Sequence, residues 1–365
     1  PWRTLPSTAR FATSMALRFS VGERVRCRVS QSEWAPGCVA QLWYREPDWP
    51  EDQLAPYQVE LDDGGLIFAP FDRDELIRAE TTFEELRYAE AREDAQASAR
   101  YREDIAAHFT RKHAALYEPA ELARFLHPAL KEALRSGEEA ALRALWTEEA
   151  RGLYSLRLFT LEFCDLLLEE CEHFEAWCAA SDVRLHRPNT MNNHGAIVDD
   201  FGLGPMMDAI MRECVQPLAR VAGYADVVGG ECRLLSHHAF IVSYALGKDL
   251  DLSFHVDSSD VTLNVCLGRE FEGGALFFRG VRCREHQSTG APPEEVHEYE
   301  HRRGMAVLHR GHHRHGARKI TSGERHSLIL WCRGDPATSS EGANGSGRPC
   351  EPWCWRHGRG DEGAH

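Results

Sequence analysis

Residues 244–278, which read YALGKDLDLSFHVDSSDVTLNVCLGREFEGGALFF, decide the fold of this chain. Apolar and polar residues alternate over 261–267, and the same period of two occurs upstream in RLLSHHAFIVSY, residues 233–244. Alternation over successive segments is typical of antiparallel strands, and Gly273 and Gly274 supply a turn. The pattern predicts a jelly-roll, in which two packed sheets turn their inner side chains toward one another.

Within this stretch, His255 and Asp257 are two positions apart, so an extended chain presents both on the same side. One imidazole and one carboxylate can therefore reach one metal ion. A mononuclear iron site for oxygen chemistry needs a second imidazole and open coordination positions. The segment HRHGARKITSGERHSLILW, residues 313–331, supplies His315 as the candidate for the third ligand.

Arg325 follows His315 by ten residues, and Ser327 completes an R-x-S arrangement. A guanidinium can hold a carboxylate bidentately, and a nearby hydroxyl can donate a further hydrogen bond. The distal histidine is not fixed uniquely, because His309, His312, His313 and His315 crowd one segment. His313 is the alternative ligand, and we expect the other histidines of this segment in a loop or lid.

The order H-x-D, distal histidine and spaced arginine resembles the 2-oxoglutarate and Fe(II)-dependent dioxygenases. The sequence around the H-x-D motif, SFHVDSSDVTLNVCLG followed by FEGGALFF, is similar to the corresponding sequences of the prolyl and lysyl hydroxylase-like branch of this family. The likeness is greatest to the proteins called 2-oxoglutarate and iron-dependent oxygenase domain-containing, whose upstream segments resemble residues 188–192 and 237–244. It covers residues 151–333, about half of the chain.

The resemblance implies an α+β fold with a double-stranded β-helix, or jelly-roll, buttressed by helices. It also implies Fe(II), 2-oxoglutarate as co-substrate and L-ascorbate. The expected reaction is hydroxylation of a prolyl or lysyl side chain in a protein or peptide, with release of succinate and CO2. The residues implied for the site are His255, Asp257 and His315 for iron, with Arg325, Ser327, Tyr244 and Asn264 for the co-substrate.

Two other functions are weighed against this one. A nucleic-acid demethylase of the same iron class would carry a second arginine six residues after Arg325, where this chain has Trp331. The formal net charge of −15 also disfavours binding to phosphate backbones. The alternative function is a peptide- or methylated-residue-binding module protein with a weakly active or inactive oxygenase domain.

The amino-acid composition limits where the protein is located and which partners it has. The twelve cysteines are spread along the chain, which is typical of reduced thiols and favours a cytoplasmic location. Apolar runs stay shorter than a bilayer span, so we expect no membrane partner. Residues 1–14, PWRTLPSTARFATS, have the composition of a transit peptide, but we favour a disordered leader, or upstream sequence that precedes a start at Met15. The sequence does not indicate an oligomeric state.

The predicted organisation has five parts: a leader at 1–18, a Tudor- or SH3-like β-barrel at 19–78, a helical spacer at 79–150, the oxygenase domain at 151–334 and a disordered tail at 335–365. The barrel's aromatic residues could form a cage for a cation, although most are expected to fill its core. They are Trp34, Trp43, Tyr44, Trp49 and Tyr57.

Two further segments carry expectations. Residues 280–303 form a polar insertion, which we expect to be a mobile loop over the mouth of the site. The tail contains Cys350, Cys354 and His357, a partial set of zinc donors.

Overall fold

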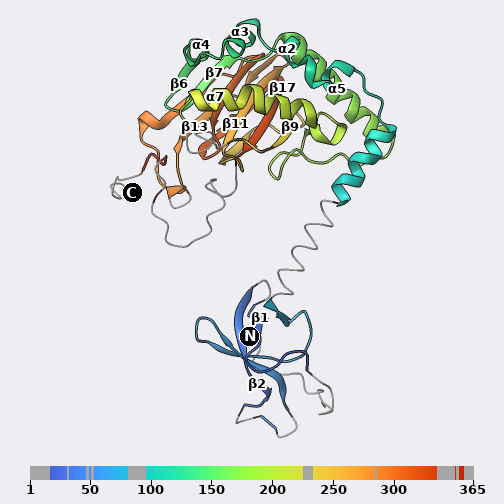
Figure 1. Cartoon of the computed structure of the whole chain (residues 1–365), viewed down its shortest axis with the longest axis vertical. Helices are drawn as coiled ribbons and strands as arrows, with labels where there is room; N and C mark the ends of the chain where they lie inside the picture. Colours follow the sequence, from blue (N-terminus) through green and yellow to red (C-terminus); the bar gives the residue numbers. More distant parts are fainter. Residues whose placement is uncertain are drawn as a thin grey trace. The chain divides into compact units, whose positions relative to one another are not determined.

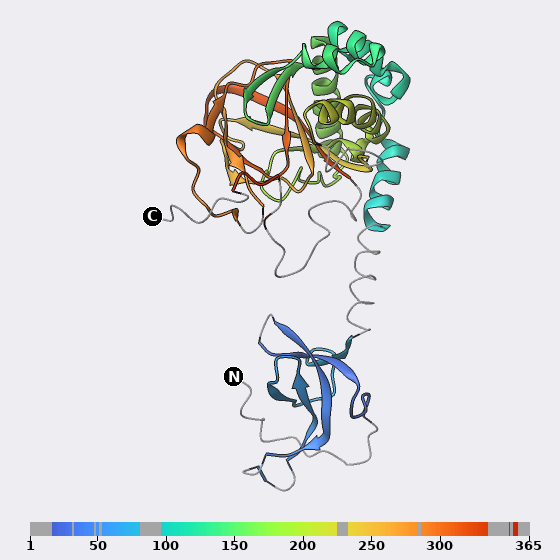
Figure 2. The same ribbon diagram turned by 60° about the vertical axis from the view of Figure 1, so that its left-hand side comes forward.

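The computed structural model describes residues 17–30, 33–46, 49–50, 53–80, 96–224, 233–283, 286–334, 350 and 353–356 (Figures 1 and 2). The chain divides into two compact units, residues 1–100 and 101–365. None of the helices in the described ranges combines the length and apolar character that a bilayer crossing requires.

The first unit is an antiparallel sheet of short strands. In the order β4-β3-β2-β1-β5, it contains β1 (Arg24–Arg28), β2 (Trp34–Tyr44), β3 (Ala55–Leu61), β4 (Leu66–Ala69) and β5 (Ile77–Ala79). Val25, Tyr57 and Ile77 are buried in its core, so Tyr57 fills the interior and cannot belong to an exposed aromatic cage. Leader residues 1–16 lie outside the described residues.

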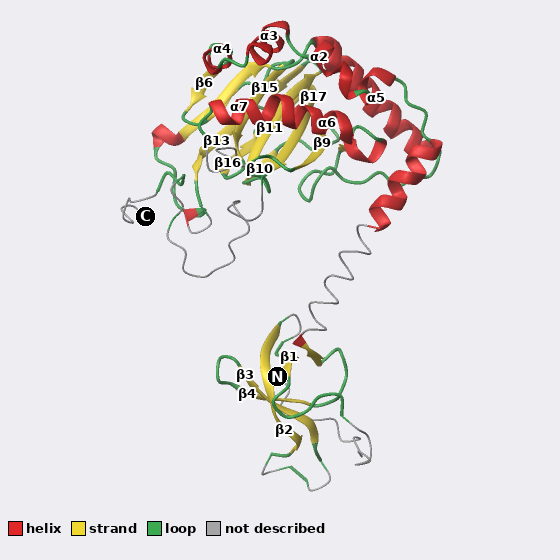
Figure 3. Ribbon diagram, in the orientation of Figure 1, coloured by secondary structure: helices red, strands yellow, loops and turns green. Residues whose placement is uncertain are grey.

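The second unit holds two antiparallel sheets (Figure 3). The larger has the order β6-β7-β15-β11-β17-β9-β8, with β12 paired to β17, and the smaller has the order β10-β16-β13-β14. The strands are β6 (Thr147–Ala150), β7 (Leu153–Arg157), β8 (Gly195–Ile197), β9 (Ser236–Ala245), β10 (Leu252–His255), β11 (Val261–Gly268), β12 (Phe271–Gly273), β13 (Leu276–Val281), β14 (Val296–Tyr299), β15 (Met305–Arg310), β16 (His313–Ala317) and β17 (Ile320–Arg333).

Helices cover the outer face of the larger sheet, where α5 contacts β11 and α6 contacts β9 (Figure 3). The helices are α2 (Leu122–Phe125), α3 (Pro128–Ser136), α4 (Glu139–Arg143), α5 (Leu161–Ala180), α6 (Gly204–Ile210) and α7 (Gln216–Val221). A π-helical turn, Met211–Val215, joins α6 to α7. Shorter 3-10 turns are η1 (Ala114–Tyr117), η2 (Pro119–Glu121), η3 (Val198–Phe201) and η6 (Pro293–Glu295).

The alternating pattern separates the two faces of the larger sheet. On β11, Val261, Leu263 and Val265 pack in the core shared with the helices, whereas Thr262 and Asn264 line a cavity on the other face. Side chains of β9 divide in the same way, because Phe240, Val242 and Tyr244 pack in the interior between the sheets. The predicted α+β fold with a helix-buttressed jelly-roll is confirmed.

Helix α5 shows why the buttress forms where the sequence places it. The Thr160 side chain accepts a hydrogen bond from the Phe163 N–H, which caps the helix start. Phe163, Leu167 and Phe174 recur at helical spacing and are fully buried. Burying each such side chain contributes about 2 kcal/mol, so this stripe anchors the helix to the sheet.

We expected residues 79–150 to form a helical spacer. From Tyr101 onward, this segment is instead part of the second unit. Ile105 lies in a helix that covers residues 96–108, Phe109 follows directly after it, and both are buried in the core of the second unit. The buried Glu170 of α5 accepts hydrogen bonds from the His113 N–H at 2.6 Å and the Tyr117 hydroxyl at 2.8 Å. Ile105 and Phe109 belong to a larger set of buried apolar residues of this segment, which together pack it into the core of the second unit.

The insertion at 280–303 also differs from the expected mobile loop. Its end forms β14, which pairs with β13, and its buried Arg282 forms an ion pair with Glu295. Among the residues described there, none lines the cavity that contains His255. The segment therefore extends the smaller sheet instead of covering the site.

Part of the predicted tail is likewise packed against the domain. Cys354 is buried, and the Trp355 N–H donates a hydrogen bond to the carbonyl of Val281 at 3.1 Å. The expectation of disorder over 335–365 is wrong for this short segment. His357 lies outside the described residues.

Candidate active site

Two imidazoles meet where the end of β10 pairs with the middle of β16. His255 and His315 are directly opposite in the antiparallel register, and their ring centroids are 4.3 Å apart. The Nδ1 atom of His255 is 2.8 Å from the carbonyl oxygen of Ser253, and that of His315 is 2.8 Å from the carbonyl oxygen of His313. Because only a protonated Nδ1 can donate to these carbonyls, the Nε2 atoms of the neutral rings keep their lone pairs.

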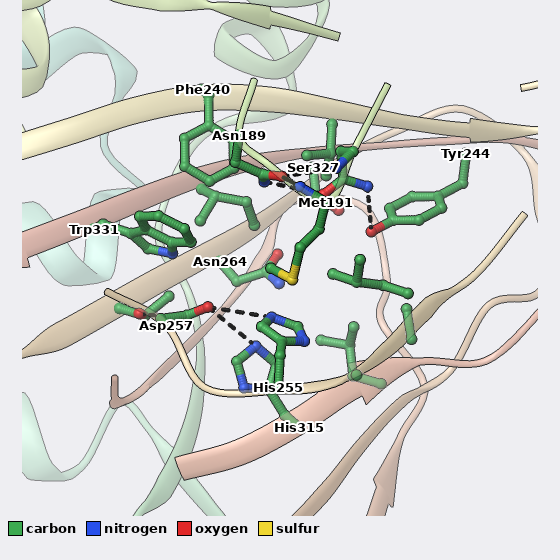
Figure 4. Close-up of a pocket in the computed structure, with 18 of the residues that line it drawn as sticks. Asn189, Met191, Phe240, Tyr244, His255, Asp257, Asn264, His315, Ser327 and Trp331 are labelled. Carbon is green, nitrogen blue, oxygen red and sulfur yellow. Dashed lines mark hydrogen bonds and ion pairs between the residues drawn. The ribbon is translucent and has the colours of Figure 1, made fainter. Parts of the chain in front are cut away.

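Asp257 brings a carboxylate to the same point from the turn after β10. Its backbone N–H donates to the carbonyl of Gly311 at 2.9 Å, which turns the buried side chain inward. Oδ1 is 3.3 Å from Nε2 of His255 and 3.6 Å from Nε2 of His315 (Figure 4). One ligand atom from each residue lies within 4.8 Å of the other two, as a two-histidine, one-carboxylate metal site requires.

The surroundings set the charges that metal binding needs. Burial lowers the pKa of His315 to about 3, so this imidazole is neutral at pH 7. Burial raises the pKa of Asp257, but the imidazoles of His315 and His255 outweigh it and hold that pKa well below its ordinary value. A neutral ring and an ionised carboxylate are the forms that bind a cation.

The structure distinguishes among the four crowded histidines by position. His313 packs against Phe278 and Trp355, with ring centroids at 5.0 and 5.3 Å, and it is absent from the group of three donors. His312 stacks on Trp353 at 4.7 Å. Sequence reasoning selected His315 by its spacing to Arg325, and that residue joins His255 and Asp257.

His309 occupies a place that sequence reasoning missed. We expected a loop or lid residue, and the structure places it on β15, opposite Thr262 in the register. Its ring centroid is 4.7 Å from that of His315, and its Nε2 is 4.0 Å from Oδ2 of Asp257. This buried Nε2 has no hydrogen-bond partner among the described residues.

The other end of the cavity carries a buried cation. Arg325 on β17 is opposite Tyr244 on β9, and its guanidinium carbon is 4.4 Å from the phenol ring centroid. The guanidinium donates to the carbonyl of Gly274, while the Tyr244 oxygen accepts from Nδ2 of Asn192 at 3.3 Å. Within the described ranges, no carboxylate forms an ion pair with Arg325. A buried charge without a counter-ion is costly, so this end of the cavity favours an anion.

Polar atoms without partners line the same cavity. They are Asn264 Oδ1, Arg325 Nε, Ser327 Oγ and Trp331 Nε1, for which the described residues offer no hydrogen-bond partner. Leaving such a buried group unsatisfied costs about 1–3 kcal/mol. The cavity therefore has a metal-binding donor set at one end and a cationic, hydrogen-bonding end opposite, which fits Fe(II) together with 2-oxoglutarate.

Sequence reasoning missed two further residues around the site. Thr262 was seen only as a polar residue on the inner face of β11, and its hydroxyl donates to Oδ2 of Asp257 at 2.6 Å. Met191, in the segment that carried the family resemblance, points into the cavity (Figure 4). The alternation of β11 could have identified Thr262, whereas nothing in the local pattern around Met191 places it there.

Comparisons with known proteins show which proteins this chain resembles. A family model described as the OGFOD2-like domain matches residues 105–229. The Arabidopsis thaliana protein named 2-oxoglutarate and iron-dependent oxygenase domain-containing protein ICU11 is 42% identical over 265 residues, which cover 73% of this chain and 64% of that protein. The Homo sapiens protein named 2-oxoglutarate and iron-dependent oxygenase domain-containing protein 2 is 45% identical over 193 residues, 53% of this chain and 52% of that protein.

The chain thus spans about half to two thirds of the length of these relatives. Among solved structures, a Pseudomonas putida prolyl-4-hydroxylase is similar with a TM-score of 0.35 and 14% identity, covering 57% of this chain and 95% of that one. The chain thus matches the OGFOD2-like domain model over residues 105–229 and is a homologue of the 2-oxoglutarate and iron-dependent oxygenase domain-containing proteins.

Proposed function

We propose that this chain is an Fe(II)- and 2-oxoglutarate-dependent dioxygenase that hydroxylates an amino-acid side chain in a protein or peptide. The observation that carries the proposal is the buried Arg325, which has no carboxylate partner among the described residues and lies in the same cavity as the three converging donors. A dicarboxylate bound to a metal at one end would supply the anion that Arg325 needs.

Each part of the site has a defined task. His255, Asp257 and His315 would hold iron on one face, and their backbone-anchored rings fix the direction of the donor atoms. Arg325, with Ser327 and Tyr244, would hold the distal carboxylate of 2-oxoglutarate. When both are bound, iron and 2-oxoglutarate supply the oxygen chemistry that yields succinate and CO2 and hydroxylates the substrate.

Substrate access is supported by a second hollow beside the cavity. The two share Asn189, Met191 and Trp331, and the second continues to His238 and Arg333. A surface groove that opens into the reacting cavity suits a polypeptide, which can lay its backbone along the groove and insert one side chain. The groove is lined by the start of β9, the end of β17 and residues of the segments 189–191 and 256–258, so the strands that carry Tyr244 and Arg325 also contribute to the substrate groove.

The cavity's lining favours an uncharged side chain. Phe240, Trp331 and Met191 supply apolar surface. Among the described lining residues, Asp257 is the sole carboxylate, and it is committed to the metal. A protonated lysine would enter without a counter-ion, which is costly in a buried site, so we propose a prolyl substrate ahead of a lysyl one.

Turnover without substrate leaves iron oxidised in enzymes of the branch that this chain resembles, and L-ascorbate is expected to restore activity. We therefore include ascorbate in the assay. Its effect is measured as succinate formed per enzyme over time, with and without the reductant.

The proposal is tested by oxygen-dependent succinate formation from 2-oxoglutarate, with peptides scored by mass spectrometry for a gain of one oxygen. Asp257→Ala removes a donor and should abolish succinate formation, while Asp251→Ala, an exposed aspartate near the same strand, is the matched control. Unchanged turnover in Asp257→Ala would remove this site from consideration. Proline- and lysine-containing peptides compared side by side identify the residue type.

The alternative function, a reader with an inactive oxygenase domain, rests on the first unit. Tyr44, Trp49 and Phe68 cluster there, and the Trp49 and Phe68 centroids are 4.8 Å apart at 86°. These half-buried rings could contact a cationic side chain. This alternative would be favoured if the wild-type chain bound methylated-lysine peptides and formed no succinate.

A further inference from the structure

A second group of metal-binding side chains lies outside the proposed active site. Cys283 and His286 follow β13, and Cys350 and Cys354 come from the C-terminal segment. One donor atom from each lies within 4.8 Å of all the others. Cys283 and Cys354 are buried, so residues separated by more than sixty positions in the sequence meet in a protected cluster.

The separations match a tetrahedral zinc site. With Zn–S of about 2.3 Å and Zn–N of about 2.0–2.1 Å, two sulfur ligands lie about 3.8 Å apart, and a sulfur and a nitrogen about 3.6 Å apart. The Sγ atoms of Cys283 and Cys350 are 3.9 Å apart. Nδ1 of His286 is 3.3 Å from Sγ of Cys283 and 3.7 Å from Sγ of Cys354.

Disulfide pairing does not explain the cluster. A disulfide bond places its sulfur atoms about 2.05 Å apart, far closer than the 3.9 Å observed between Cys283 and Cys350. None of Cys283, Cys350 and Cys354 forms a disulfide bond. Three thiols and an imidazole therefore converge at hydrogen-bonding separations and without a covalent bond between the sulfur atoms, which is the arrangement that a shared metal ion requires.

We propose that Cys283, His286, Cys350 and Cys354 bind one zinc ion as a structural site. The four donors complete a tetrahedral shell and leave no position for water or substrate, which distinguishes structural zinc from catalytic zinc. The spacings are C-x2-H and C-x3-C, short enough for each pair to grip one ion from a single turn. The site is separate from the proposed iron centre and requires none of its ligands.

The position of the site indicates what the zinc holds together. Beside it, Trp353 stacks on His312, and the Trp355 ring lies 5.3 Å from that of His313. The carbonyl of His313 accepts the hydrogen bond that orients His315. The zinc would fix the C-terminal segment against β13 and the start of β16, and so support the strand that carries a proposed iron ligand.

The test measures metal content in the full chain carrying Asp257→Ala, which removes metal binding at the proposed iron site. After dialysis against a weak chelator, elemental analysis should find about one zinc per chain. Cys350→Ser and Cys354→Ser should each lower that content at least about fivefold. Cys38→Ser, which changes a half-buried cysteine of the first unit, is the matched control and should leave the zinc unchanged.

A cysteine variant could lose zinc because it misfolds. A second measurement therefore uses a chain in which all four proposed zinc ligands are intact. Replacing the bound zinc with Co(II) in the Asp257→Ala chain should give the visible absorption and the thiolate charge-transfer band of tetrahedral cobalt with cysteine ligands. Absence of both zinc and the cobalt spectrum would overturn the proposal, as would full zinc content in the Cys350→Ser and Cys354→Ser chains. A disulfide among these cysteines in freshly purified protein would overturn it as well.

Discussion

The hydroxyl of Thr262 donates a 2.6 Å hydrogen bond to Oδ2 of Asp257, and the other oxygen of that carboxylate faces the Nε2 atoms of His255 and His315. One hydroxyl on β11 therefore decides which carboxylate oxygen is free for a metal. Ser259 lies 2.7 Å from the same hydroxyl and fixes its direction. Replacing a side chain that orients a metal ligand without touching the metal typically lowers metal affinity about 10- to 100-fold.

Thr262→Val keeps the shape of the side chain and removes the donor. We expect iron affinity to fall about 10- to 100-fold, because the carboxylate is free to rotate. An anaerobic Fe(II) titration measures the change, and Thr262→Ser should restore most of the affinity. Thr321→Val, at an exposed threonine of β17, is the control. Equal iron affinity in Thr262→Val and wild type would contradict this role.

Replacing the crowded histidines one at a time tests which of them holds the metal. His315→Gln removes a donor that converges on Asp257 and should abolish iron binding. His313→Gln should retain it, because this ring packs against Phe278 and Trp355, and its backbone carbonyl still orients residue 315. The measurement is iron stoichiometry after anaerobic loading, and the reverse result would assign the ligand to His313.

Arg325→Gln tests the anion-binding end of the cavity. The change removes a buried charge that has no carboxylate partner among the described residues, so the KM for 2-oxoglutarate should rise about 10- to 100-fold, as expected for loss of hydrogen bonds to a charged group. Iron binding should be retained, because Arg325 is not among the converging donors. Arg318→Gln removes an exposed arginine paired with Glu298 and serves as the control. An unaltered KM would count against Arg325.

His237 on β9 lies between two carboxylates and gives the stability of the fold a pH dependence. Burial lowers its pKa, but the hydrogen bond to Asp199 and the charges of Asp199 and Asp208 outweigh this, and its pKa is raised above the ordinary 6.5. A raised pKa means that the charged pair stabilises the fold below about pH 6.5 and that this contribution disappears as the pH rises through the raised value.

His237→Gln should therefore lower the free energy of unfolding by about 2 kcal/mol at about pH 6 and by clearly less at about pH 9. Urea denaturation at the two pH values measures the difference. His108→Gln removes an exposed histidine paired with Asp104 and should show little change at either pH. A loss that is equal at both pH values, or larger at the higher one, would contradict the prediction.

The sequence was sufficient to predict those parts of the fold in which the local residue pattern reflects the tertiary structure. The period of two around Thr262 and Asn264 reflects a sheet with one face toward the helices and one toward the cavity, and the structure has this arrangement. The glycine turn was equally readable, because Gly273 and Gly274 have φ angles of +75° and +65°, which other residues rarely adopt.

Other features depend on contacts between distant segments, which a local pattern does not contain. The C-terminal segment is polar and rich in glycine, yet the Trp355 N–H donates a hydrogen bond to Val281 of β13, more than seventy residues away, and Cys354 is buried. The helix at 96–108 carries many charges, so Ile105 and Phe109 gave too weak a stripe to reveal the core they enter. His309 looked like one of several loop histidines because it stands close to His312, His313 and His315 in the sequence, and the local pattern does not show that β15 continues through it.

The most direct test of the proposed metal site is an anaerobic titration of the chain with Fe(II) and 2-oxoglutarate, followed by visible absorption. Wild-type chain should develop the metal-to-ligand charge-transfer band of a chelated 2-oxo acid at one equivalent of iron, and Asp257→Ala should not. If the wild-type chain gave no band, or if Asp257→Ala gave the same band, the three converging side chains would not be the iron site.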